Sequence, residues 1–450
     1  MNSALPSSEV VPAARNTARA GRASFGLRRG NRGAALLAAL CFATVLAISL
    51  GSYMTVCYRT LALSSRTVQG TRAIELAESG MEDALWALNK NDWSAWTITG
   101  STATRVISGF NFDGGVTGTI SLQVTSYDGS AGTRTVSVTG TTTQPDGSTI
   151  SRRLTSTSSR APLFINAVAG TTGRVRFRSA GTADSYDSSL GTYASQTPGY
   201  TAIVASGSTS TSSATVQLTN AQIKGYVSTL STGPSYSTSG KLVGPTTPVT
   251  TKIDPTRITT SPYQPIFDEV VPSGAGTTLP GGSATIGTSG ATAAELYYAT
   301  DLYLTGSQVL TVDGPVVLVV SGDFNISSSA KIRITTNGSL RIHLAGDLTI
   351  NGNGIQNDTQ LPKNLLIIST SNPYDTFGMA TNTPFYGVIY TPVSSITVSN
   401  SQTIYGAIVA KAVTFNASPV LHYDLDLRRT VFSGLDTPYA VADWRETSTD

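Results

Sequence analysis

Hydrophobic residues fill the chain between Arg32 and Arg59, where 26 consecutive residues carry no charge. At about 1.5 Å per residue, a helix of this length spans roughly 39 Å, which exceeds the ~30 Å hydrocarbon core of a bilayer. A secretory signal peptide has an apolar region of only about 7–15 residues, so the length argues against one. The pattern predicts a membrane-spanning helix over residues 34–58.

Beyond Arg59 the hydrophobic positions become periodic. From Ile74 to Leu88 they recur every three or four residues, while glutamates occupy another face, as expected of an amphipathic helix. The helix is therefore predicted to continue over residues 59–92. The apolar residues expected to face membrane or protein neighbours along its whole length are Leu36, Leu37, Leu40, Leu46, Ile48, Leu50, Ile74, Met81 and Leu85.

Residues 100–160 alternate between apolar and polar positions, the pattern of a strand with one buried face. The alternation is clearest at residues 120–124, 136–138 and 150–154. Asp128-Gly129 and Pro145-Asp146-Gly147 supply turn residues between these runs. We therefore expect a small antiparallel sheet.

The C-terminal half repeats on itself. Residues 316–326 align with residues 340–350 at a shift of 24, and residues 386–390 align with residues 405–409 at a shift of 19. Short apolar strands at the spacing of one coil predict a right-handed parallel β-helix over residues 161–430. A β-sandwich would not explain the aligned Gly-Asp pairs. The expected turn residues are Gly322, Asp323, Gly346, Asp347, Gly387 and Gly406.

Two stretches are assigned from composition. The Pro/Thr-rich residues 244–272 are too polar for a buried coil, so they form either a linker or an excursion across the β-helix surface. Residues 431–450 are expected to cap the last coil or to form a tail.

The charges lie unevenly. Six arginines and one glutamate precede Ala34, so residues 1–33 form a basic leader, which the positive-inside rule places in the cytoplasm. The remaining residues hold 24 basic against 26 acidic side chains, a balance of −2, so no nucleic-acid surface follows. Cys41 and Cys57 lie about 24 Å apart along the helix and cannot pair within the chain.

Candidate chemistry is sparse. Asp323 and Asp347 could lie on adjacent coils, but their position after Gly favours a turn role over catalysis. His343 is expected to point outward from its strand, and His422 to lie near the last coil; neither has a close partner at metal-ligand spacing. We therefore predict no catalytic residues, no metal and no cofactor, and expect that the chain is not an enzyme.

The N-terminal segment resembles that of type IV pilin-like proteins, and among them the PilX-type minor pilins. The resemblance rests on the basic residues before Gly33, the apolar run, and the Ala-Glu-Ser-Gly-Met-Glu-Asp-Ala-Leu sequence at residues 77–85. It implies a pilin-like helix followed by a small antiparallel sheet. Together with the β-helix predicted from the repeats, the expected fold is mainly β with one long N-terminal helix. The resemblance also implies cleavage by prepilin peptidase between Gly33 and Ala34. The fifth mature position, Ala38, lacks the glutamate of most pilins, as PilX-type proteins often do, and an uncleaved anchor is the alternative.

Two functions remain open. The first is a minor pilin-like protein, anchored in the inner membrane with a periplasmic ectodomain or exposed at the cell surface on a pilus. Its partners would be prepilin peptidase, the major pilin, other minor pilins and a surface glycan, host or abiotic surface, with no nucleic acid. The second is a membrane-tethered β-helical protein that binds or cleaves polysaccharide. End-to-end polymerisation of β-helices is a third option.

Overall fold

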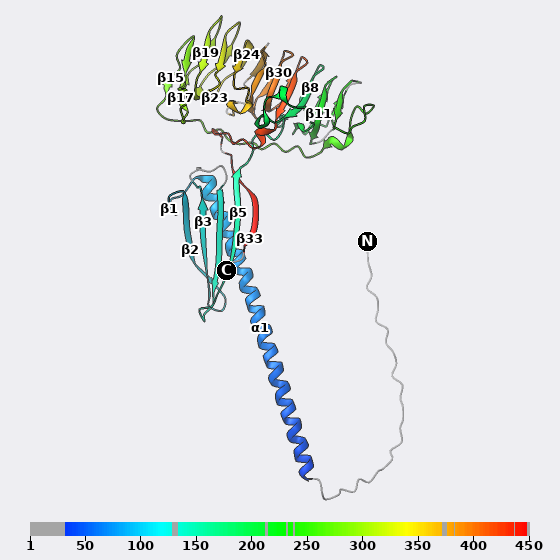
Figure 1. Cartoon of the computed structure of the whole chain (residues 1–450), viewed down its shortest axis with the longest axis vertical. Helices are drawn as coiled ribbons and strands as arrows, with labels where there is room; N and C mark the ends of the chain where they lie inside the picture. Colours follow the sequence, from blue (N-terminus) through cyan, green and yellow to red (C-terminus); the bar gives the residue numbers. More distant parts are fainter. Residues whose placement is uncertain are drawn as a thin grey trace.

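The computed structural model describes residues 32–127, 134–211, 215–230, 233–236, 239–370, 376–381, 383–435 and 437–447. It is mainly β with one long N-terminal helix, an antiparallel sheet and a stack of parallel strands, which confirms the predicted fold class (Figure 1). The predicted leader up to residue 31 and the Asp128-Gly129 turn lie outside the described residues.

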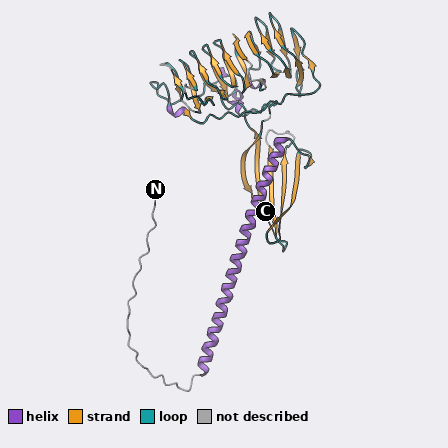
Figure 2. Cartoon of the chain, turned by 180° about the vertical axis from the view of Figure 1, so that it is seen from behind, coloured by secondary structure: helices purple, strands orange, loops and turns teal. Residues whose placement is uncertain are grey.

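Helix α1 (Arg32–Lys90) is continuous over 59 residues, so the apolar and amphipathic segments form a single rod (Figure 2). The helix ends where Asn91 adopts a positive φ of 50° and the Asp92 amide donates to the carbonyl of Ala87 at 3.1 Å. This is the C-terminal arrangement in which a left-handed residue satisfies the last free carbonyls.

The C-terminal part of α1 packs on a six-stranded antiparallel sheet. The strand order is β1 (Thr97–Thr99), β2 (Thr102–Phe112), β3 (Val116–Thr125), β4 (Arg134–Thr143), β5 (Thr149–Arg160) and β33 (Tyr439–Thr447). Alternate side chains of the strands point to the helix and form one core with it. This core includes Leu76, Ala77, Met81, Ala84, Ile120, Leu122, Val136 and Val138.

The C-terminus corrects the prediction for residues 431–450. Instead of a cap or tail, β33 pairs antiparallel with β5, with Trp444 opposite Ser156. The β-helix is therefore an insertion between two neighbouring strands of the small sheet. Sequence could not show this, because the pairing joins segments almost 300 residues apart.

The inserted region consists of short strands and five 3-10 turns. The strands form a 14-stranded, a nine-stranded and a four-stranded sheet. Their bounds are β6 (Val168–Gly170), β7 (Val175–Phe177), β8 (Thr182–Tyr186), β9 (Ala202–Ser206), β10 (Val216–Leu218), β11 (Gln222–Thr229), β12 (Ser235–Tyr236), β13 (Lys241–Val243), β14 (Ile258–Thr259), β15 (Thr277–Thr278), β16 (Ala284–Ile286), β17 (Glu295–Ala299), β18 (Leu302–Leu304), β19 (Val309–Val312), β20 (Pro315–Val320), β21 (Phe324–Ile326), β22 (Lys331–Ile334), β23 (Ser339–Leu344), β24 (Leu348–Gly352), β25 (Ile355–Asn357), β26 (Leu365–Ile368), β27 (Thr376–Thr381), β28 (Phe385–Thr391), β29 (Ser395–Val398), β30 (Thr403–Ala410), β31 (Val413–Phe415) and β32 (Val420–Asp424). The 3-10 turns are η1 (Ser188–Leu190), η2 (Tyr193–Ser195), η3 (Pro255–Arg257), η4 (Pro362–Asn364) and η5 (Leu425–Arg428).

The register confirms both sequence repeats. Val316 pairs with Leu340 and Phe324 with Leu348, a shift of 24 residues, while β28 pairs with β30 at a shift of 19. All strand pairings within the three sheets of the inserted region are parallel, and the inward side chains form one continuous apolar core. The predicted right-handed winding stays a prediction.

The coils are not stacked in sequence order. In the nine-stranded sheet β7 lies between β31 and β10, so the chain enters the stack at its middle. Residues 168–259 build one end, and residues 277–424 then run from the opposite end back to the middle (Figure 1). We call residues 168–259 the first arm and residues 277–424 the second arm. The two arms meet where the ring of Phe177 stacks on that of Phe415, with 4.7 Å between the ring centroids.

The segment between the arms, residues 263–274, which we call the strap, runs along the outside of the stack. It contacts Asn166 at the middle, Tyr390 in β28, His343 in β23 and Tyr298 in β17, in that order. The composition of residues 244–272 predicts either a linker or an excursion across the β-helix surface. The last part of this region, from residue 263, forms the excursion.

Candidate membrane helix and surface groove

Helix α1 has two halves with opposite surroundings. Every residue from Ala34 to Val68 is exposed, whereas Gln69 to Leu88 includes the residues buried against the sheet. Within the described residues this is the one helix long and apolar enough to cross a membrane. Exposed apolar surface costs roughly 25 cal/mol per Å² in water, so the N-terminal half requires a cover of lipid or protein.

The predicted helix residues divide between these halves. Met81 is buried, and Ile74 and Leu85 are half-buried, so these three belong to the packed half. The exposed ones are Leu36, Leu37, Leu40, Leu46, Ile48 and Leu50. Gly33 and Ala34, the predicted processing site, lie in the first turn of α1. Cys41 and Cys57 are free and exposed.

The predicted turn aspartates form a ladder. The amide of Asp323 donates to Oδ1 of Asp301 at 2.8 Å, and the amide of Asp347 donates to Oδ1 of Asp323 at 3.0 Å. Each carboxylate thus accepts a hydrogen bond from the next coil. Gly322 and Gly346 precede these aspartates in the bends after β20 and β23.

Gly387 and Gly406 are corrections, because they lie inside β28 and β30 rather than in turns. Their role is close stacking of two strands. A Cβ on Gly406 would lie 1.9 Å from the carbonyl oxygen of Gly387, and the φ of Gly406 is 137°.

Both histidines are buried beside a carboxylate. His343 points away from the interior, as predicted, but the strap covers it and its Nδ1 lies 2.7 Å from Glu269. His422 lies in the middle of the stack, because the first arm continues beyond it, and its Nδ1 is 2.6 Å from Asp184. The ring of Tyr193 covers His422 at 3.6 Å between centroids.

His422 also belongs to a row across the 14-stranded sheet. Tyr386, Tyr405, His422 and Asp184 occupy equivalent positions on successive coils. Tyr386 and Tyr405 stack at 4.2 Å with their planes 3° apart. Because these ring faces cover one another, the row stabilises the junction of the arms rather than offering a flat aromatic platform.

Asp424, beside this row, is a buried carboxylate. Its Oδ1 accepts hydrogen bonds from the amides of Ser188 and Asp426, while Oδ2 has no partner within the described residues. Burial raises its pKa above the ordinary value. No group of three side chains that could hold a metal ion is found in the described part of the chain.

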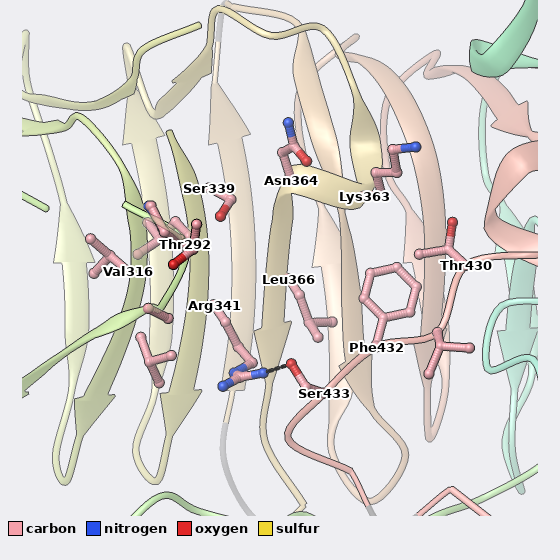
Figure 3. A pocket seen from close by; sticks show the side chains of 15 residues that line it. Thr292, Val316, Ser339, Arg341, Lys363, Asn364, Leu366, Thr430, Phe432 and Ser433 are labelled. Carbon is pink, nitrogen blue, oxygen red and sulfur yellow. Dashed lines mark hydrogen bonds between the residues drawn. The ribbon is translucent and has the colours of Figure 1, made fainter. Parts of the chain in front are cut away.

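A groove of about 330 Å³ lies on the outer face of the 14-stranded sheet (Figure 3). Strands β20, β23 and β26 form its floor, and the return segment, residues 430–435, passes over one side. The residues that line it are Thr292, Ala294, Pro315, Val316, Val317, Ser339, Leu340, Arg341, Lys363, Asn364, Leu366, Thr430, Val431, Phe432 and Ser433.

Arg341 is the unusual residue of the groove. Its Nη1 donates to Oγ of Ser433, and its buried Nε has no partner within the described residues (Figure 3). Desolvation by burial lowers the pKa of its guanidinium. Sequence reasoning missed this side chain, although the charge between Leu340 and Ile342, where the preceding repeat has Val317, was a readable signal.

Comparison with known proteins gives three findings. Residues 265–430, from the strap to the return segment, match a domain of unknown function, DUF7305. No curated protein matches the chain. A crystal structure of the competence-associated pilin ComZ from Thermus thermophilus is similar at a TM-score of 0.23 and 11% identity, over 84% of this chain and 97% of that one.

Proposed function

We propose that this chain is a membrane-anchored, minor pilin-like protein that presents a β-helical domain for adhesion or structural support. The observation that supports this most is the division of α1 into an exposed apolar half and a half packed on an antiparallel sheet. A simple anchor does not require the same rigid helix to continue into the core of the adjoining domain. A subunit that is moved from a membrane into a filament requires such a continuous helix, because the helix then carries the domain with it.

The insertion of the β-helix between two strands of the small sheet supports the proposal that the helix and sheet present this domain. Two neighbouring strands, β5 and β33, lead into and out of the inserted domain, so it is tied to the sheet at two points. The amide of Tyr439 also donates to Oδ1 of Asn89 at 2.6 Å, next to the end of α1. A domain held by two strands keeps its orientation to the helix better than one on a single linker.

In this proposal prepilin peptidase removes the leader at Gly33, and Ala34 becomes the mature N-terminus. The exposed half of α1 first lies in the inner membrane and then packs against the major pilin and other minor pilins. The β-helix binds its target without turnover, so the protein is not an enzyme.

Fractionation of shed filaments tests the proposal. An epitope tag on the full chain would be followed in sheared filaments and in membranes, in cells with and without a working pilus assembly platform. We expect the tag in the filament fraction only when the platform is present. Retention in the membrane fraction of both strains would contradict incorporation into filaments.

The alternative is a membrane-tethered protein that binds or cleaves polysaccharide, with α1 as anchor only. The groove at Arg341 favours a binding role of this kind. The two proposals differ in the filament fraction, because a tethered protein stays in the membrane.

A further inference from the structure

The charged residues that line the groove are all basic. Its lining includes two basic residues, Arg341 and Lys363, and contains no aspartate or glutamate. Lys363 is already neutralised, because its Nζ lies 3.0 Å from Oδ2 of Asp426. Arg341 forms no ion pair with any carboxylate among the described residues, so its charge is unbalanced on the groove wall.

The position of Arg341 makes this charge costly. Across the sheet, Leu296, Val317, Arg341, Leu366 and Val388 occupy equivalent outward positions on successive coils. Arg341 is the one charged member of this apolar row. A partly buried cation without a carboxylate partner among the described residues opposes folding, whereas an apolar residue of similar size would continue the row.

Holding the return segment does not account for the arginine. The bond from Arg341 to Ser433 joins a guanidinium to one neutral hydroxyl, which uses one of its five N–H donors. Its planar fork matches a carboxylate or phosphate oxygen pair instead. The Nε of Arg341 is buried and has no hydrogen-bond partner among the described residues.

The other lining groups define the ligand further. Ser339, Asn364 and Thr430 place neutral polar groups around the groove, while Phe432 and Leu366 offer apolar surface (Figure 3). Hydroxyl-bearing rings with apolar C–H faces use this mixture of partners. A volume of about 330 Å³ lies at the lower end of the range for small-ligand sites, roughly 300–1,000 Å³.

We propose that this groove binds an acidic sugar, with the carboxylate of a uronic-acid-type pyranose on Arg341 and its hydroxyls on the neighbouring polar side chains. The inference rests on the proposed role of the β-helix as a surface-presented domain and names the ligand class of that domain. The sugar can belong to a soluble polymer or to a glycolipid, which present the same chemistry.

Titration calorimetry on the full chain in detergent micelles tests the proposal. The probes are an oligomer of galacturonic acid, its methyl ester and inorganic phosphate. Arg341→Gln removes the charge, Thr292→Trp fills the exposed rim of the groove, and Arg178→Gln is the control. Arg178 is exposed next to β7, outside the groove.

We expect the oligogalacturonate to bind and its methyl ester to bind at least tenfold more weakly. Arg341→Gln is expected to weaken binding about 10- to 100-fold, because charge-assisted hydrogen bonds are lost. Thr292→Trp should weaken binding as well, and Arg178→Gln should leave it unchanged. Because Thr292 is exposed, that variant tests the groove even if Arg341→Gln disturbs the fold.

The proposal would be overturned if the oligogalacturonate and its methyl ester bound equally well. It would also be overturned if neither Arg341→Gln nor Thr292→Trp weakened binding, or if phosphate bound as tightly as the oligomer. Vesicles that carry a glucuronosyl lipid then distinguish the sources, since a glycolipid site binds them more tightly than the soluble oligomer. Binding does not depend on leader processing, so failure here leaves the filament proposal standing, and failure of the filament proposal leaves this result intact.

Discussion

The two halves of α1 share one backbone and differ in what surrounds them. The half from Ala34 to Val68 is exposed and carries no charge before Arg59, and the half from Gln69 to Lys90 is amphipathic and packs on the antiparallel sheet. The hydrophobic residues of one helix therefore serve two different environments. Those of the packed half stabilise the fold, and those of the exposed half fit a membrane or neighbouring subunits.

Two methionines give the largest expected contrast. Met81 is buried in the core with the sheet, whereas Met54 in the exposed half is 61% exposed. Met81→Ala should lower the free energy of unfolding by about 2–5 kcal/mol, because it removes packed atoms and leaves a cavity. Met54→Ala should change it by less than about 0.5 kcal/mol. Denaturant unfolding in detergent measures both, and equal losses would contradict the division.

A charge in the exposed half should affect the membrane rather than the fold. Leu46 lies near the middle of the uncharged run. Leu46→Arg should cost about 2.5–3.5 kcal/mol of insertion free energy and move protein out of the membrane fraction, because arginine is unfavourable at the bilayer centre. The matched change Ser65→Arg, at an exposed position outside the run, should leave membrane partition unchanged. Normal partition of Leu46→Arg would refute a spanning role.

Two glycines repeat the contrast on a smaller scale. A Cβ on Gly80 would lie 2.5 Å from Cγ2 of Ile120 and 2.6 Å from Cγ1 of Val138, whereas Gly51 has nothing within 4 Å. Gly80→Ala should destabilise the fold by about 1–3 kcal/mol through overpacking. Gly51→Ala should favour the helix slightly. The midpoint temperature of thermal unfolding measures both effects. An unchanged midpoint for Gly80→Ala would show that helix and sheet separate easily.

The smallest effect concerns charge. Arg105 in β2 donates to Asp83 of α1 at 2.7 Å, and both side chains are 28% exposed. Arg105→Gln should cost about 0.2–1 kcal/mol, a difference that shrinks in high salt. Arg66→Gln, in the exposed half, serves as the control and should have no effect on unfolding. A salt-independent loss for Arg105→Gln would mean that packing, rather than the ion pair, stabilises this contact.

Much of the fold could be predicted because local pattern decides it. The uncharged run before Arg59 and the period of the apolar stripe describe α1, and the repeats at shifts of 24 and 19 residues describe the stacked coils. These signals lie within short windows of the chain. The same kind of pattern predicted that His343 points outward.

The missed features depend on partners distant in sequence. Nothing near Tyr439 indicates that β33 pairs with β5, and nothing near Phe415 indicates that β7 covers the last coil. Strand alternation cannot tell an exposed outward side chain from one that the strap covers, as it covers His343. The groove arises from the return segment lying over β23 and β26, so the residues next to Arg341 in sequence do not indicate that it lines a groove.

N-terminal mass spectrometry of the native membrane-associated protein, with and without prepilin peptidase, tests the central proposal most directly. The pilin-like account predicts a mature N-terminus at Ala34 in cells that have the peptidase and an intact leader in cells that lack it. An intact leader in both would contradict it and leave a tethered β-helical domain whose α1 serves only as an anchor.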